Sequence, residues 1–210
     1  MFVEPSVQAL VAGEQWLQDA ASWIYINAQT TVTLSCLIWI YLFRNKSFYF
    51  VRNMFLTAFF IALIGYVVYP AAPPRFFPEW GFHDSVEEFT GIPQDSVTVN
   101  ALFNPYAAVP SMHVGFALMI GWPLALLAKR RAVKVFWSLY PFLVTFVIVV
   151  TANHFLADAF LGACTAGIGA LVALLMAQTR PVWAFRGLPD ADEDADLAPL
   201  GAPAREPAAA

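Results

Sequence analysis

Charged residues are scarce in this chain: they make up 12% of its 210 residues, whereas 60% are hydrophobic. Soluble globular domains carry about twice that charged fraction. The low charge and a mean hydropathy of +0.62 exclude an ordinary soluble domain and predict an integral membrane protein. The net charge of −4 gives no guide to a partner, because five of the fifteen acidic residues lie between positions 190 and 196. We expect no nucleic-acid partner.

Cysteine is almost absent as well. The chain has two cysteines, Cys36 and Cys164, and both lie inside apolar stretches. This excludes a disulfide framework or a zinc cluster, so we interpret both as small buried hydrophobic residues and expect no metal or other cofactor. The first residues also lack the basic stretch, short apolar run and small-residue cleavage site of a secretory signal peptide.

In place of charged residues and cysteines, the sequence contains long apolar runs. A hydrocarbon core about 30 Å thick requires roughly 20 apolar residues in a helix. We therefore predict an all-α, polytopic membrane helix bundle with about five transmembrane helices, formed by residues 1–180. The apolar segments are 23–43, 51–69, 112–128, 133–151 and 154–176.

The two ends of the chain differ from these spans. Apolar residues at helical spacing from Val7 to Leu17 predict an N-terminal amphipathic helix, lying either on the membrane surface or against the bundle. The Ala-, Pro- and Asp-rich residues 187–210 are predicted to form a disordered tail. In the last span, small residues at helical spacing predict close packing against a neighbouring helix; they are Ala159, Ala163 and Gly167.

The lysines and arginines orient the predicted bundle. There are eleven, and all except Arg75 lie in the tail, between the first and second spans, between the third and fourth, or just after the fifth. The positive-inside rule places these regions in the cytoplasm, so the loop 70–111 and the turn 151–153 face outward and the C-terminal tail is cytoplasmic. We therefore predict a multi-pass protein of the cell membrane, with Arg75 as the one basic residue on its outer side.

Two histidines at the outer ends of predicted spans are the main candidates for function. His154 and Asp158 are four residues apart, so they share a helix face and the carboxylate leans toward the imidazole. Such a carboxylate can hold the Nδ1 proton and leave Nε2 free as a nucleophile. The alternative is an ion pair on a helix surface, but burying an aspartate in an apolar span costs roughly 2.5–3.5 kcal/mol even on the lenient insertion scale.

The second histidine, His113, follows Pro110 and Ser111 at the start of the third span. Ser111 can cap that helix and Asn153 can cap the fifth. Unpaired N–H groups at two helix N-termini, together with Arg75, would bind an anion, so Ser111 is either a cap, a phosphate contact or both. His113 is then placed to protonate a leaving oxygen, unless it is a packing residue.

At these residues the chain resembles the type 2 phosphatidic acid phosphatase superfamily of membrane-embedded lipid phosphatases and phosphotransferases. The Pro-Ser-x-His core of the family's second motif is matched by residues 110–113, and the His-x-x-x-Asp of the third by His154 and Asp158. The resemblance implies that His154 forms a phosphohistidine intermediate, that Asp158 orients it and that His113 is the general acid. It also implies phosphate binding by two further residues, Ser111 and Arg75.

Three positions depart from the family's usual pattern. Val68 stands where the first motif has a lysine, and Ile148 where the third has an arginine. Met112 replaces the glycine that usually precedes the second-motif histidine. With two cations fewer, phosphate binding relies more on backbone donors and on Arg75.

Other segments resemble the inositol phosphorylceramide synthase-like branch of the superfamily, namely 73–75, 104–113 and 151–154. Members of that branch transfer a phosphoryl-alcohol head group between lipids. Transfer from a phosphodiester lipid therefore competes with hydrolysis as the predicted reaction. Asn104 is expected either to contact the head group or phosphate, or to form a turn before Pro105.

The sequence thus favours a metal-independent lipid phosphatase or phosphotransferase that acts at the extracytoplasmic face on a phospholipid or polyprenyl phosphate. One alternative is an intramembrane metalloenzyme with His113, His154 and Asp158 as ligands. Another is a non-enzymatic transporter in which these residues line an ion path. No particular oligomeric state is indicated. The outer loop also contains aromatic residues that are expected either to cover a lipid head group or to anchor the loop; they are Phe76, Phe77, Trp80, Phe82 and Phe89. His83 lies among them and is interpreted as a surface residue.

Overall fold

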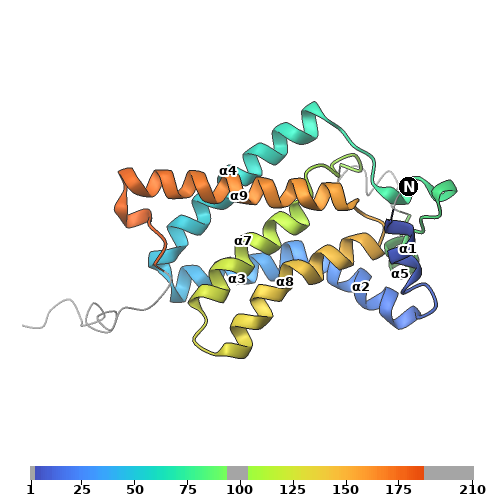
Figure 1. The fold of residues 1–210 in the computed structure, drawn as a ribbon, viewed down its shortest axis with the longest axis horizontal. Coiled ribbons are helices and arrows are strands. Elements are labelled where there is room, and N and C mark those ends of the chain that lie inside the picture. The colour runs from blue at the N-terminus through green and yellow to red at the C-terminus, as the bar shows by residue number, and fades with distance from the viewer. Residues whose placement is uncertain (1–2, 94–103, 187–210) are drawn as a thin grey trace, which may run out of the picture.

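The computed structural model describes residues 3–93 and 104–186, and the predicted tail at 187–210 lies outside these residues. The described residues form an all-α bundle of long apolar helices, as predicted (Figure 1). Within these ranges there is no strand, and an isolated bridge joins Ala71 to Ala107. The principal helices are α2 (Gln15–Asn27), the π-helical turn η1 (Ala28–Val32), α3 (Thr33–Phe43), α4 (Asn45–Val68), α7 (Met112–Leu127), α8 (Arg131–Val150) and α9 (Leu156–Thr179).

Four helical segments in the described chain are long and apolar enough to cross a membrane. The first, Gln15–Phe43, consists of α2, η1 and α3 joined end to end, and the others are α4, α8 and α9. The remaining apolar helix, α7, has 16 residues and is shorter than the roughly 20 that a straight crossing needs. The apolar helices therefore follow the predicted order, although the first begins at Gln15, well before the predicted start at residue 23.

The predicted N-terminal amphipathic helix is divided in two. Only α1 (Glu4–Ala9) is separate, because the polar and apolar residues after Gln15 belong to the first long helix. The side chains of Glu4 and Gln8 are buried, and Gln8 donates hydrogen bonds to the carbonyls of Val150 (3.0 Å) and His83 (2.7 Å). Of the two predicted placements, the structure therefore shows the one against the bundle.

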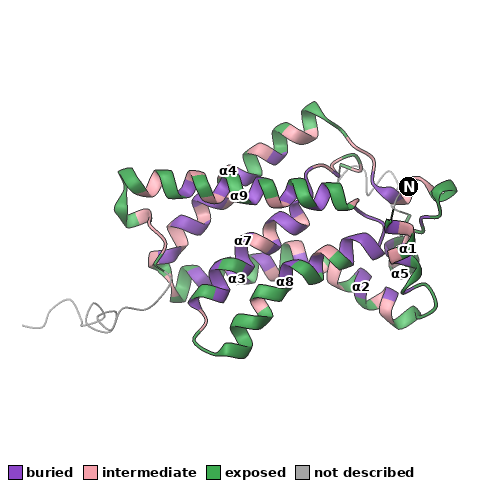
Figure 2. Cartoon of the chain, in the orientation of Figure 1, coloured by how far each residue is buried: buried purple, intermediate pink, exposed green. Residues whose placement is uncertain are grey.

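The buried residues gather where α4, α7, α8 and α9 face one another, while the outward faces of these helices remain apolar and exposed (Figure 2). A helix that is apolar on all sides is typical of a membrane span. The outward faces are therefore suited to contact with acyl chains.

Close packing of α9 follows the prediction only in part: Ala159 is buried in the core as expected, but Ala163 is half-buried and Gly167 is exposed. A Cβ atom at Gly162 would lie 2.1 Å from the carbonyl oxygen of Ser111, and one at Gly169 would lie 2.7 Å from that of Met54. By contrast, no atom lies within 4 Å of a Cβ built on Gly167. Small residues occur on more than one face of α9, and only the position of α4 and α7 decides which face packs.

Helix direction brings the predicted site to one end of the bundle. There α7 and α9 begin and α4 and α8 end, on the right in Figure 1. The same end carries α1 and α5 (Ser85–Thr90), and the loop after α4 also contains the short 3₁₀ turns η2 (Pro74–Phe76) and η3 (Pro78–Trp80). Residues that are far apart in the sequence therefore meet at this end.

Candidate active site

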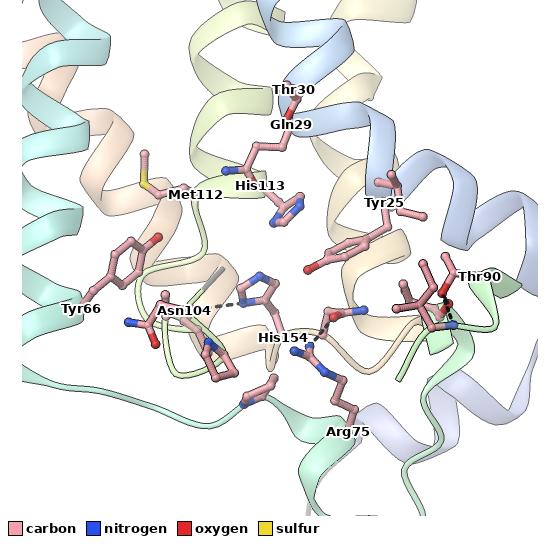
Figure 3. Close-up of a pocket in the computed structure, with 18 residues that line it drawn as sticks. Tyr25, Gln29, Thr30, Tyr66, Arg75, Thr90, Asn104, Met112, His113 and His154 are labelled. Carbon is pink, nitrogen blue, oxygen red and sulfur yellow. Dashed lines mark hydrogen bonds between the residues drawn. The ribbon is translucent and has the colours of Figure 1, made fainter. Parts of the chain in front are cut away.

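A cavity of about 620 Å³ lies at this end of the bundle. Four of the six predicted site residues line it, and they come from separate parts of the chain: Arg75, Asn104, His113 and His154 (Figure 3). The other two, Ser111 and Asp158, are buried beside the cavity and are not among the described residues that line it. The structure thus assembles the motif residues around one space.

The orientation of His154 is fixed by a backbone carbonyl. Its Nδ1 atom lies 3.0 Å from the carbonyl oxygen of Ala108 and 3.5 Å from Oδ2 of Asp158. Because a carbonyl oxygen can only accept, Nδ1 carries the proton and the lone pair is on Nε2. The structure thus has the tautomer that a nucleophilic Nε2 needs, but Ala108, which the sequence did not indicate, is the nearer acceptor.

Asp158 caps the helix that follows. Its Oδ2 atom accepts a hydrogen bond of 2.9 Å from the backbone N–H of Phe155. The sequence placed Asn153 at this cap, which is wrong, because α9 begins at Leu156 and Phe155 is its N-cap. The backbone N–H groups of Asn153 and His154 instead bond back to Ile148, so the chain makes a turn before the helix starts.

His113 lies in the first turn of α7, opposite His154. The two ring centroids are 5.5 Å apart with an interplanar angle of 59°. The other neighbour of His113 is Tyr25 of α2, whose ring stacks on it at 4.4 Å and 21°. Both imidazoles therefore border the same part of the cavity, and Tyr25 holds one of them in place.

Arg75 ties the outer loop to the turn before α9. One guanidinium nitrogen donates to Oδ1 of Asn153, and Nε lies 3.4 Å from Oδ2 of Asp84. The backbone N–H of Arg75 donates to the carbonyl of Ala152, whose φ of +52° is strained for alanine. No other lysine or arginine is among the described residues that line the cavity, so this guanidinium is the fixed positive charge there.

Ser111 and Asn104 are held in different ways. Ser111 is the N-cap residue of α7, but its side chain makes no capping hydrogen bond, and its buried Oγ has no partner among the described residues. Asn104 makes the predicted turn, since its Oδ1 accepts from the N–H of Tyr106 at 3.0 Å. It also lines the cavity, so a turn and a substrate contact are compatible.

Several lining residues were not found from the sequence. Tyr25, Gln29 and Thr30 come from the first long helix, and Tyr66 from α4, where its hydroxyl donates to the carbonyl of Pro110 at 3.0 Å. The available signal was the presence of polar side chains within an apolar span, which is costly without a function.

Two predicted residues of the outer loop, His83 and Phe82, are not among the described residues that line the cavity. His83 is exposed and lies 2.7 Å from Glu88, and it is not among the described lining residues. Phe82 is buried against Phe155, with ring centroids 5.8 Å apart, as expected for an anchor of the loop.

Across the described residues, no group of three or more His, Cys, Asp or Glu side chains is arranged to hold a metal ion. The metalloenzyme alternative therefore has no support from this geometry.

Comparison with known proteins gave one match. A family model described as the PAP2 superfamily matches residues 1–172, a range that includes every predicted site residue. No curated protein and no solved structure matches the chain.

Proposed function

The chain belongs to the PAP2 superfamily and is thus a lipid enzyme of the phosphatase or phosphotransferase type, and we propose that it works through a phosphohistidine formed on His154. The observation that carries this proposal is the hydrogen bond from Nδ1 of His154 to Ala108, which leaves Nε2 as the free nitrogen. The cavity then offers a nucleophile, a second imidazole and a guanidinium within one space.

The proposed reaction has two steps. Nε2 of His154 attacks phosphorus, the bond from phosphorus to the lipid oxygen breaks, and His113 gives its proton to that oxygen. Water or an alcohol then attacks the phosphohistidine, the nitrogen–phosphorus bond breaks, and His113 takes the proton of the entering oxygen. Arg75 balances charge on the phosphoryl oxygens, and the Asp158 carboxylate stabilises positive charge on the His154 ring. The reaction needs no metal ion.

Charge in the cavity favours a phosphodiester as the donor. Arg75 is the one lysine or arginine among the described lining residues, and Asp84 lies 3.4 Å from its Nε. A phosphomonoester carries about −1.5 to −2 charges at neutral pH, whereas a diester carries one. Head-group transfer of the inositol phosphorylceramide synthase type is therefore our second candidate, beside hydrolysis.

We place this chemistry at the extracytoplasmic face of the cell membrane. The basic residues at 44–52 and 129–134 lie at the start of α4 and around the α7–α8 connection, which is the other end of the bundle from the cavity. The positive-inside rule makes that other end cytoplasmic.

Labelling tests the proposal directly. Purified protein is incubated with phospholipids labelled at phosphorus, with and without alcohol acceptors, and both the products and any acid-labile label on the protein are measured. We expect wild-type protein to carry label and turn over, and His154→Ala to do neither while keeping its thermal unfolding midpoint. His83→Ala is the matched control and should retain both activities, because His83 is exposed and outside the cavity lining. Wild-type turnover by His154→Ala would overturn the assignment.

A further inference from the structure

The cavity continues past His113, away from Arg75. Figure 3 shows the order of the lining residues from the bottom of the view to the top: first Arg75, then His154, then His113, and finally Gln29 with Thr30. The inner end beyond His113 is thus formed by one stretch of the first long helix. This stretch carries no charged side chain among its described lining residues, unlike the end at Arg75.

A π-helical turn forms this inner end. Tyr25 and Gln29 are four residues apart and share a helix face, whereas Gln29 and Thr30 are adjacent and would point in different directions on a regular α-helix. Both nevertheless line the cavity, and both belong to η1. Single π turns inside α-helices occur frequently at functional sites.

The polar atoms of this stretch are not used within the described protein. The carboxamide of Gln29 and the hydroxyl of Thr30 make no hydrogen bond to another described residue, whereas the hydroxyl of Tyr25 points back toward His154 and Arg75 (Figure 3). An unpaired polar group inside a membrane span costs free energy, so these groups are suited to a ligand that offers hydrogen-bonding partners at this depth.

We propose that Gln29 and Thr30 form a subsite for the linkage region of the substrate lipid, meaning the ester or amide carbonyls between the phosphoryl oxygen and the acyl chains. This inference rests on the proposed function, in which His113 protonates the oxygen between phosphorus and the lipid alcohol. The groups just beyond His113 then meet the atoms that follow that oxygen. In a glycerolipid or a sphingolipid these atoms include carbonyls, which accept from amide and hydroxyl donors, whereas a polyprenyl chain has only carbon and hydrogen there.

The residues beside the subsite provide a path for the acyl chains from the cavity to the bilayer. Ile26 and Thr30 line the cavity and are also exposed on the outside of the first long helix. Exposed residues inside a membrane span contact acyl chains. The polar linkage is therefore held inside the cavity while the tails pass Ile26 into the bilayer.

The test compares two lipids that differ only at the linkage. The probes are a phosphodiester lipid with ester-linked chains and its analogue with ether-linked chains of the same length and head group, both in mixed micelles. We expect wild-type kcat/KM to be about tenfold lower for the ether lipid, the effect of about one hydrogen bond. Gln29→Met should lower kcat/KM for the ester lipid by a similar factor and leave the ether lipid unchanged. Gln15→Met, on the same long helix but exposed and outside the described lining, should behave as wild type.

Three results would each overturn the subsite. The first is equal wild-type kcat/KM for the ester and ether lipids, and the second is faster turnover of a polyprenyl phosphate than of the ester lipid. The third is an equal loss of kcat/KM on both lipids in Gln29→Met; if that variant does not fold, Thr30→Val is measured in its place. Label on His154 is measured in the same samples: label without ester preference refutes the subsite alone, whereas wild-type protein with neither label nor turnover refutes the proposed function.

Discussion

The Nδ1 atom of His154 lies 3.0 Å from the carbonyl oxygen of Ala108, a residue 46 positions earlier in the chain. This hydrogen bond joins the turn before α9 to the segment before α7. A second hydrogen bond lies beside it: the N–H of Ser111, the N-cap residue of α7, donates to the carbonyl of Asp158 in the first turn of α9 at 3.0 Å. The orientation of the proposed nucleophile therefore depends on how these two helix starts pack together.

Asp158 is expected to act on the His154 ring mainly through its charge. In Asp158→Asn the amide oxygen can still accept from the Phe155 N–H, so thermal stability should stay near that of wild type. kcat should fall about 10- to 100-fold, because a neutral side chain 3.5 Å from Nδ1 no longer stabilises positive charge on the ring.

Asp158→Ala is the companion variant and should show a similar fall in kcat. It should also lower the unfolding free energy by about 0.5–2 kcal/mol, because the helix cap is lost. Thermal unfolding and steady-state kinetics on the two proteins separate these effects. Wild-type kcat in Asp158→Asn would show that the charge has no catalytic role.

Arg75→Lys should raise KM at least about tenfold with a smaller change in kcat. A lysine ammonium has no planar fork, so it cannot face Asn153, Asp84 and a phosphoryl oxygen at once as the guanidinium can. Arg180→Lys, at the far end of α9, makes the same change away from the cavity and should leave both constants unchanged. An unaltered KM in Arg75→Lys would argue against a substrate contact.

Gly162→Ala should destabilise the protein severely, by more than about 4 kcal/mol, or prevent folding. The added Cβ would lie 2.1 Å from the backbone oxygen of Ser111, and neither backbone can move without separating α7 from α9. Gly167→Ala is the matched control on the same helix: it has no atom within 4 Å and should change the unfolding free energy by no more than about 1 kcal/mol. Equal thermal midpoints for the two variants would contradict this packing.

Labelling of single cysteines should establish which end of the bundle faces outward. In a background with Cys36 and Cys164 replaced by alanine, Glu79→Cys in the outer loop should react with a membrane-impermeant thiol reagent in intact cells. Lys129→Cys, between α7 and α8, should react only after lysis. Both positions are exposed, so the difference reports sidedness. The reverse pattern would place the cavity in the cytoplasm.

Some features of the site could be predicted from the sequence because they are local. His154 and Asp158 are close because four residues make about one helical turn, and Arg75 stood out as the one basic residue of its loop. Features that depend on distant segments were missed, among them the Ala108 acceptor and the contribution of Tyr25. The start of α9 was also misplaced, since the turn before it uses backbone hydrogen bonds to Ile148 that no spacing rule reveals.

The sequence by itself determined the all-α membrane bundle, its apolar helices and the motif residues at one end, because each of these follows from the composition and spacing of neighbouring residues. Only the tertiary structure decided that Gly162 and Gly169 form the packed face of α9, that a carbonyl holds His154, and that Gln29 extends the cavity. The physical reason is that packing and hydrogen bonds between helices are set by the relative position of whole segments, which a local pattern of residues does not contain.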